Sequence, residues 1–197
     1  MKEMNPGFME AFHRVERMGR RDFLKASAMA AGLWAATALV RPNQAIAAVP
    51  EGVVHLSVSE VAFFEHLVRV ALPTEGSNLV PTEKIPVLQT LDAALLGTMA
   101  PHILEGLKGG IAYFNDGPLE RFGKRFVELS LHDARAFCDE WADSAQVPHR
   151  ALSVGLKKLI GLAYWANPPT WAPLGYDGPV TDKWNLKSLG NSPLPSA

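Results

Sequence analysis

The sequence predicts an all-α protein: a single domain of five to six helices, followed by an extended C-terminal tail rich in proline, glycine and aromatic residues. Three observations support this fold class. Apolar residues recur at spacings of three and four along several stretches between residues 57 and 166, which is the period of an amphipathic helix. Residues that favour helix starts precede these stretches. No stretch shows the sustained apolar–polar alternation and turn chemistry of a β-hairpin.

The first helix is predicted from Ser57 to about Leu72. Ser57 and Glu60 have the spacing of a capping box, in which each side chain accepts a hydrogen bond from the other residue's backbone N–H. Apolar residues cover most of the circumference, and the remaining polar strip is formed by Ala62, Glu65, His66 and Arg69. A helix that is apolar over most of its girth contacts several neighbours. We therefore expect this helix at the centre of the domain.

A long connection with three prolines follows over residues 73–86. Loops of this length without secondary structure are often functional or lie on a partner. Pro86 suits the first turn of a second helix, whose apolar side carries Leu88, Leu91 and Leu95. A third helix is predicted over residues 102–114, and the Asn-Asp-Gly-Pro sequence of residues 115–118 is typical of a turn.

Three more helices complete the predicted domain. A short one is expected over residues 119–129. Ser130 and Asp133 form a typical N-cap pair for the next helix. The inward face of that helix is expected to carry Ala134, Phe137, Cys138 and Trp141. Pro148 opens the last long helix, which ends near residue 166. Its inward face is formed by Leu152, Leu156, Leu159 and Ala163.

The character of the sequence changes at residue 167. Residues 167–197 contain six prolines, three glycines and no helical period, but also Trp171, Tyr176 and Trp184. Disordered tails usually lack aromatic residues, so we expect this tail to pack on something. It either closes the core of its own domain as a strap or docks on another chain, where Tyr and Trp are favoured anchors. Both interpretations stay open, since one segment can serve both purposes.

Residues 1–47 are predicted to be an extension and a twin-arginine signal peptide, which directs the folded chain through the Tat translocase to the periplasm. The export motif consists of Arg20, Arg21, Phe23, Leu24 and Lys25. The alanine-rich run over residues 26–40 is shorter than the roughly 20 strongly apolar residues of a membrane span, which favours a signal over an anchor. Ala45 and Ala47 form the small-x-small cleavage site. Residues 48–166 then form the helical domain, and residues 167–197 the docking tail.

Charge and cysteine content exclude several classes of protein. Residues 48–197 contain 12 Lys and Arg against 16 Asp and Glu, a net charge of −4, so nucleic acid is not an expected partner. Because Cys138 is the only cysteine, the sequence has no internal disulfide, no CxxCH haem attachment motif and no thiolate zinc cluster. Cys138 is interpreted as a small core residue.

No residue pattern predicts catalysis in this chain. None of the histidines of the predicted mature part has a metal-ligand spacing; they are His55, His66, His102, His132 and His149. His66 with Arg69, and His132 with Asp133, are interpreted as solvated or hydrogen-bonded polar faces. The sequence has no glycine-rich nucleotide loop after a strand and no nucleophile elbow. We expect no catalytic, cofactor or metal site.

Several motifs together carry a family resemblance. A twin-arginine signal precedes a small helical domain that opens with Phe63-Phe64 and Ala71-Leu72-Pro73 and closes on Tyr164-Trp165, Trp171 and Gly175-Tyr176-Asp177-Gly178-Pro179. In these features the chain resembles the gluconate 2-dehydrogenase subunit 3 family, the small subunits of membrane-associated flavin dehydrogenases. The resemblance covers residues 57–179 and the signal.

The resemblance implies a subunit without an active site. Its partner would be a large FAD-binding subunit of the glucose-methanol-choline oxidoreductase type, which lacks a signal of its own and is exported with the small subunit. A multihaem cytochrome c often completes such a complex at the membrane. The resemblance also assigns the conserved docking and folding end to Trp171, Gly175, Tyr176, Asp177, Gly178 and Pro179.

From these observations we expect a non-catalytic escort that stabilises and co-exports an FAD-dependent sugar or alcohol dehydrogenase. Two alternatives remain at the level of sequence. One is a free-standing periplasmic ligand-binding or enzymatic domain, which requires a concave pocket with convergent polar groups. The other is a small electron-transfer protein, which requires a bound haem or flavin.

Overall fold

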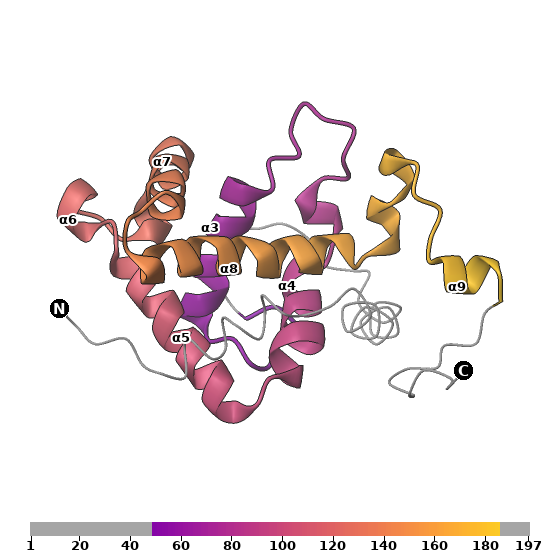
Figure 1. Ribbon diagram of the computed structural model, residues 1–197, viewed down its shortest axis with the longest axis horizontal. Coiled ribbons are helices and arrows are strands. Elements are labelled where there is room, and N and C mark those ends of the chain that lie inside the picture. Colours follow the sequence, from indigo (N-terminus) through magenta and orange to yellow (C-terminus); the bar gives the residue numbers. More distant parts are fainter. Residues whose placement is uncertain (1–48, 186–197) are drawn as a thin grey trace, which may run out of the picture.

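The computed structural model describes residues 49–185, which form α-helices and shorter helical turns without a strand (Figure 1). The all-α fold predicted from the sequence is confirmed. Its long helices are α3 (Val58–Ala71), α5 (Pro101–Asp116), α7 (Leu131–Ala142) and α8 (Val147–Trp165). Between residues 49 and 185 no helix is both long and apolar enough to cross a membrane.

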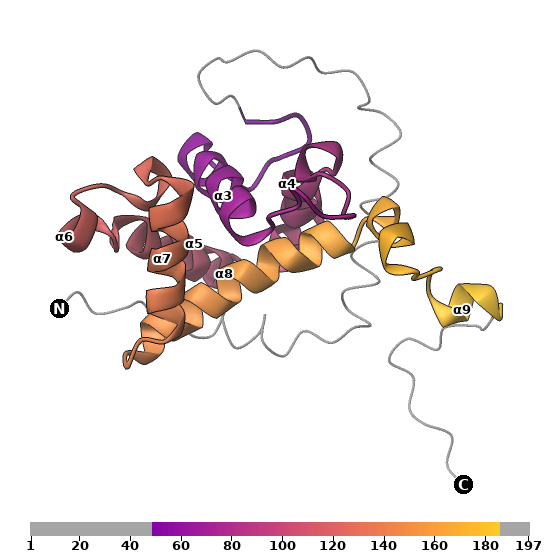
Figure 2. The ribbon, with the colours of Figure 1, turned by 90° about the horizontal axis from the view of Figure 1, so that it is seen from above.

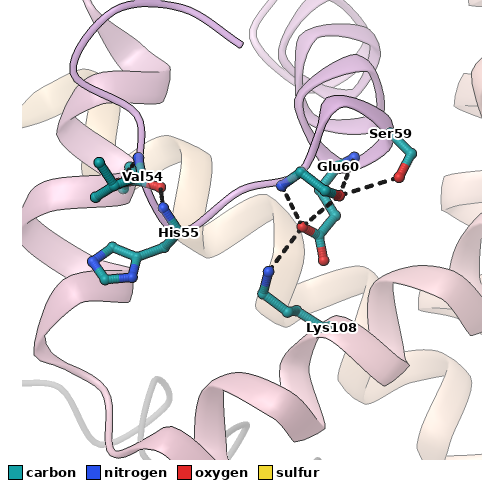
Figure 3. A network of polar contacts seen from close by, with 7 residues as sticks. Val54, His55, Ser59, Glu60 and Lys108 are labelled. Carbon is teal, nitrogen blue, oxygen red and sulfur yellow. Dashed lines mark hydrogen bonds and ion pairs between the residues drawn. The ribbon is translucent and has the colours of Figure 1, made fainter.

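Helix α3 is at the centre of the domain, as expected. It packs against α4 (Val87–Thr90), α5, α7 and α8. The predicted capping box is present: the Ser57 hydroxyl accepts the Glu60 N–H, and Glu60 Oε2 accepts the Ser57 N–H at 2.7 Å. The same Glu60 oxygen pairs with Lys108 Nζ of α5 at 3.0 Å, so the cap also joins two helices (Figure 3).

The interpretation of His66 as part of a solvated or hydrogen-bonded polar face is wrong. Its side chain is only 6% exposed, and its Nε2 has no hydrogen-bond partner among the described residues. The imidazole instead stands nearly perpendicular to the ring of Phe126, at a centroid distance of 5.2 Å. The cause is the turn η4 (Phe126–Glu128), which packs on α3 and covers a side of the helix that the sequence pattern assigns to solvent.

A group of aromatic rings joins α3, α5, η4 and α7. The Phe126 ring centroid lies 5.4 Å from that of Phe63, 5.1 Å from that of Phe114 and 6.0 Å from that of Phe137. Trp141 extends the group, with its ring 5.0 Å from Phe114. The edge-to-face and tilted arrangements are those that aromatic quadrupoles favour. This aromatic cluster forms one half of the core.

The second helix of the prediction is built from three short pieces. Pro86 is the N-cap of α4, which continues into the π-helical turn η2 (Leu91–Leu95) and the 3₁₀ turn η3 (Leu96–Thr98). The predicted apolar residues of this helix, Leu88, Leu91 and Leu95, are all buried. Asp92 in the π-helical turn is also fully buried, and its carboxylate accepts the backbone N–H groups of Val54 and His55, each at 2.9 Å. These two hydrogen bonds hold the non-helical segment before α3 against the core.

The predicted helix over residues 119–129 is wrong as a single element. The chain forms α6 (Leu119–Phe122), breaks at Gly123, and resumes only in the turn η4. Gly123 has a φ of +66°, in the left-handed region that favours glycine and ends helices. Helix α5 also extends through Asp116, two residues beyond its predicted end. The break lets Phe126 turn back into the core.

Helices α7 and α8 form a closely packed pair. The Ser130 hydroxyl accepts the Asp133 N–H, so the predicted N-cap of α7 is confirmed. Ser153 of α8 donates a hydrogen bond to the Cys138 carbonyl at 2.8 Å. Cys138 itself is buried, and burial raises the pKa of its thiol to about 11, as expected for a core residue. All residues that the sequence assigned to the inward faces of these two helices are buried.

Helix α8 runs along the domain, and its last turn is still packed, since Ala163 and Tyr164 are buried. Figures 1 and 2 show α3, α5 and α7 around its first half, α4 beside its second half, and the segment after its C-terminus projecting from the body. The long loop before α4 is tied to the same helix, because the Tyr164 hydroxyl donates to the Val80 carbonyl at 2.6 Å. The C-terminal segment is therefore carried by a rigid helix end.

The aromatic cluster predicts opposite effects for two glycine substitutions. A Cβ added at Gly117 would lie 2.5 Å from Cζ2 of Trp141 and 2.8 Å from Cζ of Phe137, so we expect Gly117→Ala to cost about 1–3 kcal/mol of unfolding free energy. A Cβ at Gly109 meets nothing within 4 Å, and Gly109→Ala in the middle of α5 should stabilise by about 0.5–1 kcal/mol. Urea unfolding measures both, and shifts of the same sign would contradict the packing described.

Buried His66 predicts a loss of stability in acid. Burial, together with the charge of Arg69, lowers its pKa below the usual 6.5. The unfolded chain restores the usual pKa and binds more protons, so the unfolding free energy falls as the pH drops through about 6.5 and onward to the folded-state pKa. Urea unfolding at a series of pH values should show a weaker pH dependence in His66→Leu. Burial lowers the pKa of His149 too, so part of the dependence remains.

The control is the same substitution at His132, which is exposed on α7. We expect His132→Leu to keep the pH dependence of the parent chain. Identical pH profiles for the parent and His66→Leu would show that the buried imidazole contributes nothing to acid sensitivity.

Candidate partner interface

The predicted site residues fall into two groups. The export motif Arg20, Arg21, Phe23, Leu24 and Lys25 and the cleavage residues Ala45 and Ala47 lie outside the described residues. The predicted partner interface lies inside them, within the segment that follows α8. This segment contains the turns η5 (Pro168–Thr170) and η6 (Ala172–Leu174) and the short helix α9 (Val180–Lys183).

A junction of hydrogen bonds fixes the start of the segment. Asn167 Nδ2 donates to the Ala163 carbonyl at 2.8 Å and to Thr90 Oγ1 of α4 at 3.3 Å. Thr170 is fully buried, and its hydroxyl donates to the Asn167 carbonyl at 2.7 Å. The chain therefore leaves α8 in a defined direction.

Trp171 packs back on the domain. Its side chain is half-buried, and Nε1 donates to the carbonyl oxygen of Trp165 at 2.9 Å, near the end of α8. The Tyr176 ring stands edge-on to it at a centroid distance of 5.2 Å, and the Tyr176 N–H donates to the Trp171 carbonyl at 3.2 Å. Trp171 thus packs against its own domain, as the strap interpretation of the tail expects, and its ring supports Tyr176.

Two glycines shape the turn around this indole. Gly175 ends η6 with a φ of +68°, which favours glycine. Gly178 has a φ of +104° and is buried, and a Cβ there would approach Trp171 to 3.6 Å. Pro179 is half-buried as the N-cap of α9. Three of the predicted interface residues therefore build the scaffold of the segment.

Asp177 closes the turn by pairing with Lys183 of α9. This hydrogen bond to the ammonium group lowers the pKa of the exposed Asp177 carboxyl. An exposed pair of this kind contributes little to stability. Its effect is to neutralise the charge of Asp177 beside Tyr176.

Four large apolar side chains of the segment are exposed. Leu174 is 57% exposed, Tyr176 44%, Val180 49% and Trp184 70%, and these four residues are called the C-terminal patch. Among the predicted interface residues only Tyr176 contributes a large exposed ring. Leu174 and Val180 are not among the predicted interface residues, although Leu174 directly precedes Gly175 and Val180 directly follows Pro179. In Figures 1 and 2 the η6–α9 segment projects away from the helical body.

An open cleft of about 420 Å³ lies between α3, the turn η1 (Thr82–Lys84) and α4. Its apolar lining is contributed by Val68, Ile85, Val87 and Leu88, all buried. Its polar lining includes Glu65 and Arg69 of α3, and Glu83 of η1. The long connection over residues 73–86 supplies one wall through Thr82, Glu83 and Ile85. The volume lies within the range of small-molecule sites.

A polar cluster around His149 was not predicted from the sequence either. The imidazole stacks on Trp141 at 4.0 Å, with Nε2 3.0 Å from the Tyr113 hydroxyl and Nδ1 3.3 Å from the Ser144 hydroxyl. Burial lowers the pKa of His149, which keeps it neutral near pH 7. Ser144 also accepts the Gln146 N–H, so we interpret the cluster as the connection that holds the start of α8 to α5 and α7.

The geometry offers surfaces for binding. Within the described part of the chain no group of three or more His, Cys, Asp or Glu residues could hold a metal ion. Comparisons with models of protein families, with curated proteins and with solved structures give no match. The interpretation of the site therefore rests on its own residues and on the motif resemblance.

The supporting role of Trp171 predicts that its loss frees the C-terminal segment. Trp171→Ala removes the Nε1 hydrogen bond and the ring under Tyr176, so we expect tryptic cleavage after Lys183 to accelerate about tenfold, while the unfolding midpoint of the domain changes little. Leu174→Ala removes a side chain that is 57% exposed, leaves both residues of the cleaved bond in place and should leave the cleavage rate unchanged. Equal cleavage rates in the parent and Trp171→Ala would show that Trp171 does not hold the segment.

Proposed function

We propose that this protein is a non-catalytic small subunit that binds a larger flavoprotein dehydrogenase, stabilises it and escorts it through the Tat pathway. The observation that carries the proposal is the C-terminal patch, in which two aromatic and two aliphatic side chains are exposed on a segment fixed to the domain. Large apolar side chains that stay exposed close together in the sequence are candidates for an interaction site. FAD would belong to the partner, and haem c to a cytochrome subunit if one joins the complex.

The fixed geometry of the segment favours affinity. A flexible tail loses conformational entropy when it binds, whereas a segment already held by Trp171 and by the Asn167 junction loses less. Tyr and Trp bury large areas with few rotatable bonds and account for much of the energy of protein interfaces. The exposed Tyr176 and Trp184 are therefore the expected anchors.

The export role comes from the sequence and the resemblance. A twin-arginine motif marks cargo that folds before it is exported, and a partner without its own signal would need such a companion. The substrate class of the partner, a sugar, a polyol or another alcohol, follows from the resemblance alone. A large FAD-binding oxidoreductase encoded beside this chain is the natural partner to test.

The second candidate function is a free-standing periplasmic ligand-binding protein. The cleft between α3 and α4 is the observation that favours it, because its lining combines an apolar floor with charged groups. The two functions can be distinguished by measuring how the flavoprotein affects the stability of this chain. A ligand-binding protein is monodisperse and indifferent to the flavoprotein, whereas an escort is stabilised by it. An electron-transfer protein would show a haem or flavin absorption band after purification.

The proposed function predicts that the C-terminal patch determines complex formation. When the full chain is co-expressed with the flavoprotein, Tyr176→Ala and Trp184→Ala should each raise the dissociation constant about tenfold or more, since each removes an aromatic anchor. Co-purification and a binding titration measure this.

Matched controls come from exposed apolar residues elsewhere on the surface. Val154 on α8 is 52% exposed and Leu131 on α7 is 41% exposed, so Val154→Ala and Leu131→Ala remove comparable side chains without touching the patch. Both should bind like the parent chain. A flavoprotein that folds, binds FAD and is exported equally well without this chain would overturn the proposed function.

A further inference from the structure

The cleft between α3, η1 and α4 carries more negative than positive charge on its lining. Glu65 and Arg69 stand one turn apart on α3, and Glu83 joins them from η1. One guanidinium neutralises one carboxylate, so the three side chains leave a net charge of −1 beside an apolar floor. A cation that enters the cleft gains the attraction of the second carboxylate, and an apolar neighbour of that cation can cover the floor.

The cleft and the C-terminal patch are both attached to the C-terminal end of α8. The Tyr164 hydroxyl of α8 holds the Val80 carbonyl, two residues before η1. Asn167, at the point where the chain leaves α8, holds Thr90 at the end of α4. Both walls of the cleft are thus fastened to the helix end that carries the patch.

The views of the molecule agree with this placement. In Figures 1 and 2, α4 and the loop before it lie at the end of the body from which the η6–α9 segment projects. A partner that covers the patch would be large enough to reach the cleft as well, since protein interfaces of standard size bury about 800 Å² on each partner.

We propose that the cleft is a second contact for the same partner and takes an extended segment of it in which a Lys or Arg side chain stands next to an apolar residue. The basic group lies between Glu65 and Glu83, and the apolar side chain lies against the small part of Val68, Val87 and Leu88 that the domain leaves exposed. This inference rests on the proposed function, and it divides the interface into an apolar anchor at the patch and an electrostatic contact at the cleft.

Charge reversal in the cleft is the test. The double variant Glu65→Lys with Glu83→Lys, in the full chain co-expressed with the flavoprotein, should raise the dissociation constant about tenfold at low salt, because it places like charges opposite each other. Raising the salt concentration should reduce the difference from the parent chain, since salt screens exposed charges. The neutral double variant with Gln at both positions should lie between the two.

The matched control reverses two exposed carboxylates at the other end of the domain. Glu120 of α6 and Asp139 of α7 are both exposed, and Glu120→Lys with Asp139→Lys makes the same change in net charge. The control should bind like the parent chain. Thermal unfolding of each variant verifies that the domain is intact, and exposed Glu65 and Glu83 can be replaced without opening the core.

The outcomes separate the inference from the proposed function. Weak binding by the cleft variant, with normal binding by the control, supports the second contact. Normal binding by the cleft variant, while Tyr176→Ala and Trp184→Ala bind weakly, overturns the second contact and leaves the escort function intact. If neither set weakens binding, the patch and the cleft are both wrong as contacts, whereas a parent chain that does not bind the flavoprotein at all would overturn the proposed function. Equal loss in the cleft variant and its control would indicate a long-range charge effect and would also overturn the cleft contact.

Discussion

The packing around Phe126 is the constraint on which the rest of the domain depends. This ring comes from a three-residue turn, yet it contacts rings contributed by α3, α5 and α7. The turn is held in place by Asn115, whose side-chain oxygen accepts the Val127 N–H at 3.2 Å. Because the described residues contain no disulfide, apolar and aromatic burial must supply most of the stability. The α7–α8 pair then extends the core toward the C-terminal segment.

Local signals in the sequence were sufficient for most of the helices. The Ser57–Glu60 and Ser130–Asp133 caps are contacts over three residues, and both are present. The inward face of α8 follows from its own spacing, because the helix is long and its period is undisturbed. These features need no knowledge of the rest of the chain, which is why the fold class and the main helices could be predicted.

Features that depend on distant residues could not be predicted in this way. Phe126 packs against the buried His66, and the chain reaches this position after the helix break at the left-handed Gly123. Asp92 would be assigned to a surface by its charge, but it is buried and satisfies two backbone N–H groups 37 and 38 residues earlier. A charged side chain is tolerated there because hydrogen bonds replace its hydration.

The candidate interface likewise has some features that the sequence predicts and others that it does not. Aromatic residues in a proline-rich tail predicted a packed segment, and Trp171 is indeed packed. Which rings face outward depends on the hydrogen bond between Trp171 and the Trp165 carbonyl, and the sequence does not show it. The glycines of the motif serve the turn around that indole, while exposure falls on Tyr176 and on neighbours outside the motif. The motif therefore located the segment but not the side chains that are exposed on it.

The environment of Cys138 has a consequence for handling the protein. A thiol with a pKa of about 11 is ionised in only about one molecule in ten thousand at pH 7, and thiolate is the form that reacts. Burial of the thiol and its raised pKa therefore both slow the reaction of Cys138 with oxidants in the folded chain. Because the buried thiol reacts only when it becomes exposed, the rate at which a thiol reagent labels Cys138 reports how often α7 and α8 separate.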